Sequence, residues 1–71
     1  MKRYFEFVGG GSEKFWEAAV SGNKVTVRFG RIGTAGQTQT KVLADADAAT
    51  KHAERLIAQK LAKGYHETVA C

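Results

Sequence analysis

A short stretch near the middle of the chain combines an aromatic ring, two guanidinium groups and closely spaced glycines. Residues 25–30 alternate apolar and polar side chains with a period of two, which is typical of a half-buried strand. In that strand Phe29 faces one side and Arg28 the other, and Arg31 joins Phe29 if the strand geometry persists. Aromatic rings stack on sugars and bases, and guanidinium groups bind phosphate. These residue types could form a site for a phosphate-bearing ligand. From the spacing alone, however, a hairpin with a buried Phe29 and solvated arginines is the favoured interpretation.

Three glycines follow one another at intervals of three residues, at Gly30, Gly33 and Gly36. This spacing suits a backbone that bends or adopts positive φ angles, where a Cβ atom would clash. Such a backbone also exposes N–H groups, which can donate hydrogen bonds to an anion. We therefore predict a structural turn with these three glycines at its bends.

Positive charge exceeds negative charge over the whole chain. There are 11 Lys and Arg residues against 7 Asp and Glu residues, which gives a net charge of +4. This excess favours polyanionic partners, such as nucleic acid or an acidic protein surface. If the sheet and the end of the helix lie side by side, several cations converge on the glycine-rich stretch. The candidate nucleic-acid-binding residues are Phe29, Arg31, Arg28, Lys41, Lys14, Lys60 and Lys63.

Other kinds of chemistry have weak support in the sequence. His52 and His66 stand far apart in the chain without a cysteine cluster or a His-Glu motif beside them, so we predict no metal site and no cofactor. Cys71 is the last residue, and no histidine has a predictable position beside it for nucleophilic catalysis. We expect no enzymatic activity. A strongly pKa-shifted His52 or Glu17 buried in a deep pocket would contradict this expectation.

The composition is that of a soluble globular protein in a reducing compartment. A single cysteine cannot form an internal disulfide bond. No apolar run is long enough to span a bilayer, and the N-terminus lacks the sustained apolar segment of a signal peptide. We expect a cytoplasmic protein without a membrane partner, associated with the nucleoid if it binds DNA.

The pattern of side chains predicts four strands followed by one helix. The expected strands are residues 2–8, 14–20, 24–30 and 37–43. Residues 9–12 read as a flexible exposed loop, and residues 65–71 as a short tail with a frayed end. This order predicts an α+β fold, in which an antiparallel sheet of about four strands carries one C-terminal helix on one face.

The helix is the most clearly marked element, over residues 45–63. Asp45 is a suitable N-cap, and Gly64 is a natural residue just after the C-terminus. Small alanines at its start would let the helix lie close to the sheet. Apolar residues recur at helical spacing to form one stripe: Ala46, Ala49, Ala53, Leu56, Ile57 and Leu61.

The sequence resembles the WGR domain family, which is named for a Trp-Gly-Arg triplet. The run Arg28-Phe29-Gly30-Arg31-Ile32-Gly33-Thr34, followed by Gly36-Gln37, resembles the family signature. Residues 14–17 resemble its second strand, and the helix with residues 60–65 resembles its C-terminal portion. The resemblance covers nearly the whole chain, residues 1–71, as a single WGR-like domain with the α+β fold given above. Phe29 stands where the family tryptophan usually stands.

The resemblance implies a non-catalytic nucleic-acid-binding module. WGR domains occur in poly(ADP-ribose) polymerases and in bacterial proteins, some of them small and free-standing. In the polymerases they bind DNA near strand breaks, where the tryptophan packs against a sugar at the DNA end and the arginine makes DNA or interdomain contacts. Those roles would fall on Phe29 and Arg31. The expected ligand is the backbone or the ends of double-stranded DNA, bound without base specificity. A protein–protein interaction module that uses the same Phe29/Arg31 surface is the alternative.

Overall fold

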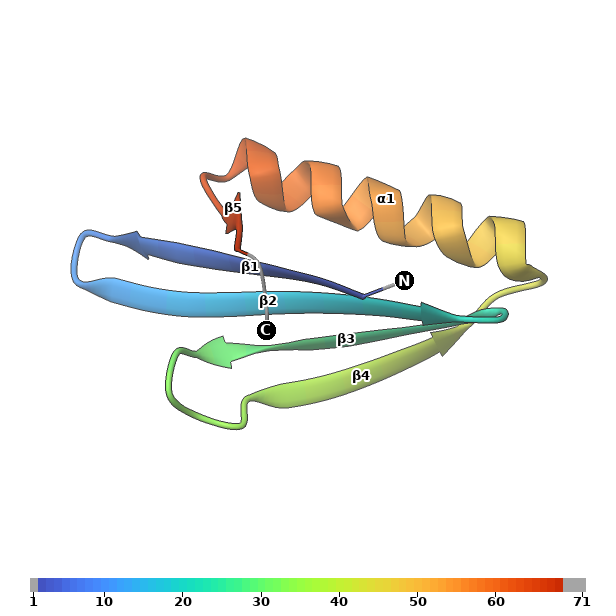
Figure 1. Cartoon of the computed structure of the whole chain (residues 1–71), viewed down its shortest axis with the longest axis horizontal. Coiled ribbons are helices and arrows are strands. Elements are labelled where there is room, and N and C mark those ends of the chain that lie inside the picture. Colours follow the sequence, from blue (N-terminus) through green and yellow to red (C-terminus); the bar gives the residue numbers. More distant parts are fainter. Residues whose placement is uncertain (1, 69–71) are drawn as a thin grey trace.

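The predicted α+β fold is confirmed in the computed structural model, which describes residues 2–68 (Figure 1). The elements in chain order are β1 (Lys2–Gly9), β2 (Ser12–Ser21), β3 (Lys24–Arg31), β4 (Gln37–Val42), α1 (Ala46–Ala62) and β5 (His66–Glu67). The strands form one antiparallel sheet in the order β4-β3-β2-β1-β5, and α1 lies across one face of it. No helix formed by residues 2–68 has the length and apolar character needed to cross a bilayer.

A tight two-residue turn connects β1 to β2, and another connects β2 to β3. The stretch Gly9–Ser12, predicted as a flexible loop, is instead a two-residue turn in which Gly10 and Gly11 have φ angles of 56° and 79°. Paired positive φ angles match the twist of the flanking strands, and glycine adopts them without steric cost. The register places Trp16 beside Phe5 on β1 and beside Phe29 on β3. All three side chains therefore share the face that α1 covers.

Helix α1 begins and ends where its capping residues predict. The carboxylate of Asp45 accepts a hydrogen bond of 2.8 Å from the backbone N–H of Ala48, and Gly64 follows the helix with a φ angle of 100°. Ala49, Ala53 and Ile57 are buried against the sheet. The predicted apolar stripe is broader than the buried one, because Ala46 and Leu61 are exposed and Leu56 is half-buried.

The helix covers only part of the sheet. It packs on β2 and β3, whereas every residue of β4 is exposed. Buried alanines bring the helix axis close to the central strands, so its side chains do not extend over the edge strand. A strip of sheet between α1 and β4 is therefore left open on the face that carries the core.

The opposite face of the sheet has a small core of its own around Phe15, which is only 3% exposed. The ring of Tyr4 stacks on it with centroids 6.0 Å apart, and the guanidinium carbon of Arg28 lies 5.0 Å from its centroid. The glycine-rich turn closes over the ring at Gly36. A Cβ atom built there would lie 2.7 Å from Cζ of Phe15 and would also collide with the carbonyl of Phe29. Gly36 is thus required by both its φ angle of 69° and this close approach.

The segment after the helix forms a fifth strand, where the sequence had predicted a tail. Residues His66–Glu67 pair with β1, and the backbone N–H of Thr68 donates to the carbonyl of Tyr4 at 2.9 Å. Two hydrogen bonds of 2.9 and 2.6 Å join the guanidinium of Arg3 to the carboxylate of Glu67. These contacts close the edge of β1. The predicted frayed end at Cys71 lies outside the described residues.

Candidate functional site

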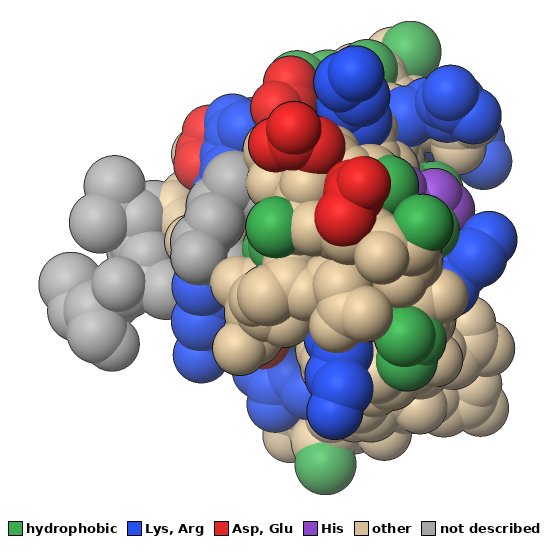
Figure 2. All heavy atoms as spheres, turned by 90° about the vertical axis from the view of Figure 1, so that its right-hand side faces the viewer, with side chains coloured by type: hydrophobic (Ala, Val, Ile, Leu, Met, Phe, Trp, Pro, Cys, Tyr) green, Lys and Arg blue, Asp and Glu red, His purple; other side chains and the backbone are tan. Residues whose placement is uncertain are grey.

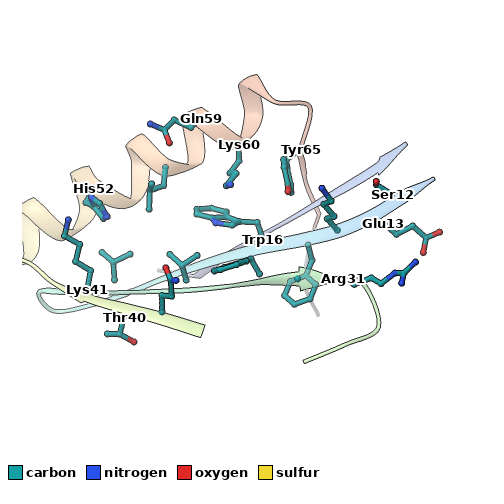
Figure 3. A pocket seen from close by; sticks show the side chains of 18 of the residues that line it. Ser12, Glu13, Trp16, Arg31, Thr40, Lys41, His52, Gln59, Lys60 and Tyr65 are labelled. Atoms are coloured by element: carbon teal, nitrogen blue, oxygen red, sulfur yellow. The ribbon is translucent and has the colours of Figure 1, made fainter. Parts of the chain in front are cut away.

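A long groove of about 1250 Å³ runs between α1 and the open half of the sheet (Figure 3). Its floor consists of apolar side chains of β2 and β3, among them Trp16, Val27 and Phe29. One wall is α1 and the other is β4, which contributes Gln39 and Lys41. The groove exists because α1 stops short of β4.

The side of α1 that faces the groove carries a second stripe of residues beside the buried one. His52, Leu56, Gln59 and Lys60 recur at intervals of four, three and one residues, and all of them line the groove. In Figure 3, Lys60 points from the helix toward Trp16, and Lys41 rises from β4 toward His52. The groove thus has an apolar floor and polar walls.

The glycine-rich turn fixes the backbone at one end of the groove. The carbonyl of Arg31 accepts two hydrogen bonds from Thr34, one from its backbone N–H at 3.1 Å and one from its hydroxyl at 2.7 Å. The backbone N–H of Ile32 donates to the carbonyl of Glu13 at 3.0 Å. Gly30 must lack a side chain, because a Cβ atom there would lie 2.8 Å from Cα of Gly36. Arg31 therefore has a fixed backbone.

The side chain of Arg31, by contrast, is free. It is exposed, and among residues 2–68 it has no hydrogen-bond or ion-pair partner. The β2–β3 register places it opposite Lys14, on the same face as Phe29, as the strand alternation predicted. The Arg31 backbone is fixed, and the donors of its planar guanidinium are unused. Such a group is suited to bind a phosphate.

Three lysines converge at this same end of the molecule. Lys14, Lys60 and Lys63 line a smaller hollow of about 260 Å³ together with Phe7 and Tyr65. Within the described part of the chain, none of the three has a carboxylate partner. The cluster therefore carries uncompensated positive charge.

Lys60 occupies the centre of this cluster. Its Nζ atom lies 5.8 Å from the ring centroid of Trp16 and 5.5 Å from that of Tyr65. Burial lowers the pKa of Lys60 below its usual value, and the charges of Lys63 and Lys14 lower it further. A bound anion would relieve this repulsion and raise the pKa again.

The predicted site residues do not all lie together. The groove brings together Phe29, Arg31, Lys14 and Lys60 at one end and places Lys41 further along, while Lys63 lines the smaller hollow next to it. Arg28 lies on the opposite face of the sheet, over Phe15, where its Nε atom is 3.6 Å from the carboxylate of Glu17.

Four residues that line the groove are not among the predicted nucleic-acid-binding residues: Gln39, His52, Gln59 and Tyr65. The helical spacing of His52 and Gln59 with Lys60 was the available signal. It was uninformative on its own, because any exposed helix face shows the same spacing.

The residues considered for catalysis or metal binding lie apart. His52 lines the groove, whereas Glu17 is on the other face of the sheet, with Lys2 and Arg28 within 3.7 Å of its carboxylate. Among residues 2–68, no three His, Cys, Asp or Glu side chains are grouped as metal ligands would be.

The two ends of α1 differ in charge. Figure 2 views the end of the molecule at which α1 begins, where acidic side chains gather on the upper part and Lys and Arg side chains surround them. Asp45 and Asp47 belong to this end of the helix, whereas Lys60 is in its last turn. A helix of this length separates the two groups by roughly 25 Å. The lysine cluster at the C-terminal end of α1 therefore lies at the end of the groove that contains Phe29 and Arg31.

Comparison with known proteins shows a matching family and similar proteins. The family model described as the WGR domain matches residues 1–70. The chain is 37% identical over 67 residues to the uncharacterized protein YfeS of Escherichia coli strain K12, covering 94% of this chain and 28% of that protein. It is 42% identical over 65 residues to the protein YehF of the same organism, covering 92% of this chain and 24% of that protein.

A solved structure shows the same fold. A crystal structure of a protein from Bacteroides fragilis superposes with a TM-score of 0.94 at 49% identity, covering 97% of this chain and 20% of that one. The chain thus spans about a quarter of the length of its curated relatives and a fifth of this structure. The resemblance read from the glycine-rich stretch is confirmed, and the chain belongs to the WGR domain family.

Proposed function

We propose that this domain binds double-stranded DNA through its backbone, without base specificity, and that it docks a DNA end against Phe29 and Arg31. WGR domains are known nucleic-acid-binding modules and are non-catalytic in general. The observation that carries the proposal is the set of uncompensated cations, Lys14, Lys60, Lys63 and Arg31, around one end of an aromatic-floored groove.

The cations supply the affinity. Each Lys or Arg that neutralises a phosphate releases a condensed counterion, and this term is independent of sequence. Burial lowers the pKa of Lys60, and repulsion from Lys63 and Lys14 lowers it further. This repulsion is a cost that the folded domain carries before it binds. A phosphate placed among them removes that cost.

The aromatic ring supplies the contact with a DNA end. Phe29 is half-buried against the core around Trp16 and lines the groove next to Arg31. Its ring can pack on a terminal sugar, as the family tryptophan does, although it has less area and no N–H donor. Interior sugars of a duplex are flanked by neighbouring nucleotides, so this contact favours an end.

Substitution of Arg31 tests the site. Arg31→Ala should weaken binding to a duplex by about 1–3 kcal/mol, the scale of a lost charge-assisted contact. Arg55→Ala is the matched control, because Arg55 is an exposed arginine on α1 that does not line the groove. Both variants lose one positive charge, so only a specific contact distinguishes them. The measurement is fluorescence anisotropy with a labelled duplex at fixed salt, after thermal melts confirm the fold.

Two outcomes would contradict the proposal. If the two variants weaken binding equally, the surface is a diffuse electrostatic one and Arg31 has no special role. If the folded domain does not bind DNA even at low salt, the alternative of a protein partner on the Phe29/Arg31 surface replaces the DNA proposal.

A further inference from the structure

The groove does not end at Phe29. The β3–β4 register continues through Val27 beside Gln39 to Val25 beside Lys41, and all four residues line the groove. From Arg31 back to Val25 the strand covers about 20 Å. This length corresponds to several nucleotides, since successive phosphates of one DNA strand are about 3.4 Å apart along the helix axis and further apart when extended. A blunt duplex end seated on Phe29 would leave most of the groove empty.

The unused part of the groove has the chemistry of a surface for unpaired bases. Its floor offers the half-buried aliphatic side chains of Val27 and Leu56, and its rims carry Gln39 on β4 and Gln59 on α1. Within residues 2–68, neither glutamine makes a side-chain hydrogen bond. An amide group both donates and accepts, so it can pair with the polar edge of any base.

The charge of the lining favours a nucleic-acid strand over a peptide of mixed charge. Among the lining residues, Glu13 carries the single carboxylate, against the cations Lys14, Arg31, Lys41 and Lys60. Grooves that hold single-stranded nucleic acid combine a cationic track for the backbone with apolar or aromatic surfaces for the bases. The walls of this groove are one helix and one strand of the same sheet, so it suits a single strand and not a duplex.

We infer that the groove between α1 and β4 binds the unpaired strand of a DNA overhang, in continuation of the duplex end held at Phe29 and Arg31. This inference rests on the proposed function, because the overhang enters the groove from the docked end. Its bases lie on Val27 and Leu56, and its phosphates follow the cations from Arg31 toward Lys41. Gln39 and Gln59 contact the base edges from opposite walls.

The experiment compares duplexes that share one double-stranded length and end either bluntly, in a 5′ overhang or in a 3′ overhang. The expected result is binding about tenfold tighter for an overhang of one polarity than for the blunt duplex. The double variant Gln39→Ala/Gln59→Ala should abolish this difference and leave the affinity for the blunt duplex unchanged. Both changes are charge-neutral and at exposed positions, so neither the salt dependence nor the fold should change.

Two further variants sharpen the assignment. Gln39→Glu keeps the shape of the side chain but repels phosphate, and it should weaken binding to the overhang more than to the blunt duplex. Thr38→Ala is the control on β4, because Thr38 pairs with Arg28 on the opposite face of the sheet. It should leave both affinities as they are.

The outcomes separate this inference from the proposed function. Equal binding of blunt and overhanging duplexes by the native domain overturns the inference and leaves the proposed function intact. A preference for overhangs that persists in the double variant places the strand elsewhere and also overturns it. Failure to bind any of the duplexes overturns the proposed function itself.

Discussion

At the level of single residues, the proposed contact with a DNA terminus depends on Phe29. Its ring packs against the core on one side and lines the groove on the other. The alternation of side chains in β3 was enough to predict that Phe29 and Arg31 share a face, because a strand has a fixed period of two. The same period put Arg28 on the other face, but it could not reveal that Arg28 covers Phe15.

The first prediction concerns the replacement of Phe29 by the family residue. Phe29→Trp should strengthen binding to a DNA end several-fold, because the indole adds contact area and an N–H donor. Titration of a labelled blunt duplex, with Phe29→Ala as the opposite change, measures the effect. Unchanged affinity in Phe29→Trp, with the fold intact, would show that the ring does not touch DNA.

The second prediction concerns the turn that fixes Arg31. Gly36→Ala should lower the free energy of unfolding by about 2–4 kcal/mol, because it combines a positive φ angle with a collision against the Phe29 carbonyl and the Phe15 ring. Gly33→Ala is the control. Gly33 has a φ angle of 93°, but a Cβ atom added there would meet no other atom within 4 Å, so only about 1–2 kcal/mol of backbone strain is expected.

Chemical denaturation of both variants makes this comparison. Equal losses of stability would mean that the turn does not close over Phe15 as described. DNA affinity, measured below the unfolding transition, should fall more for Gly36→Ala, since its distortion reaches the backbone next to Arg31.

At the level of elements, the lateral position of α1 creates the groove. The sequence predicted the helix, its caps and its buried alanines, because each depends on local spacing. It did not predict that α1 stops short of β4, because the apolar stripe indicates which face of the helix is buried but not which strands the helix covers. Leu56, which was assigned to the same stripe as Ile57, packs half-buried against the core and also lines the groove.

The strand β5 was also missed from the sequence. Only two of its residues pair with β1, which is too short a run for a period of two to be recognised. Besides its backbone pairing with β1, it is joined to that strand by the contact between Arg3 and Glu67, two residues far apart in the sequence. A long-range ion pair of this kind leaves no local pattern.

The third prediction concerns the pH dependence of this contact. The hydrogen bonds from Arg3 hold the pKa of Glu67 below its ordinary value. A depressed carboxylate pKa contributes stability above the pKa of the unfolded chain, about 4.3, and this contribution is lost as the pH falls through the folded value. Glu67→Gln should therefore lower the melting temperature at pH 7, and the difference from the native domain should vanish near pH 2–3.

Thermal melts across this pH range measure the difference, with Glu13→Gln as a control at an exposed carboxylate that has no partner among the described residues. A difference that stays constant down to low pH would show that the charge of Glu67 does not hold β5 in place.

At the level of the whole molecule, the fold gathers cations from separate elements at one end of the groove. Asp45 and Asp47 lie at the start of α1, and the lysine cluster lies at its end. The composition predicted an excess of cations but could not place it, because only the fold brings Lys14 of β2 to Lys60 and Lys63 of the helix end. Such a cluster favours the approach of a polyanion at the Phe29/Arg31 end of the groove.

The most direct test of the DNA-end proposal is a salt titration with two duplexes of one sequence. One has open, blunt, 5′-phosphorylated ends, and the other has both ends closed by hairpin loops. We predict tighter binding to the open duplex at every salt concentration. The logarithm of its association constant should fall with a slope of about −3 against the logarithm of salt concentration, as expected for three to four neutralised phosphates. Equal affinities for the two duplexes, or binding that does not weaken with salt, would contradict end docking at Phe29 and Arg31.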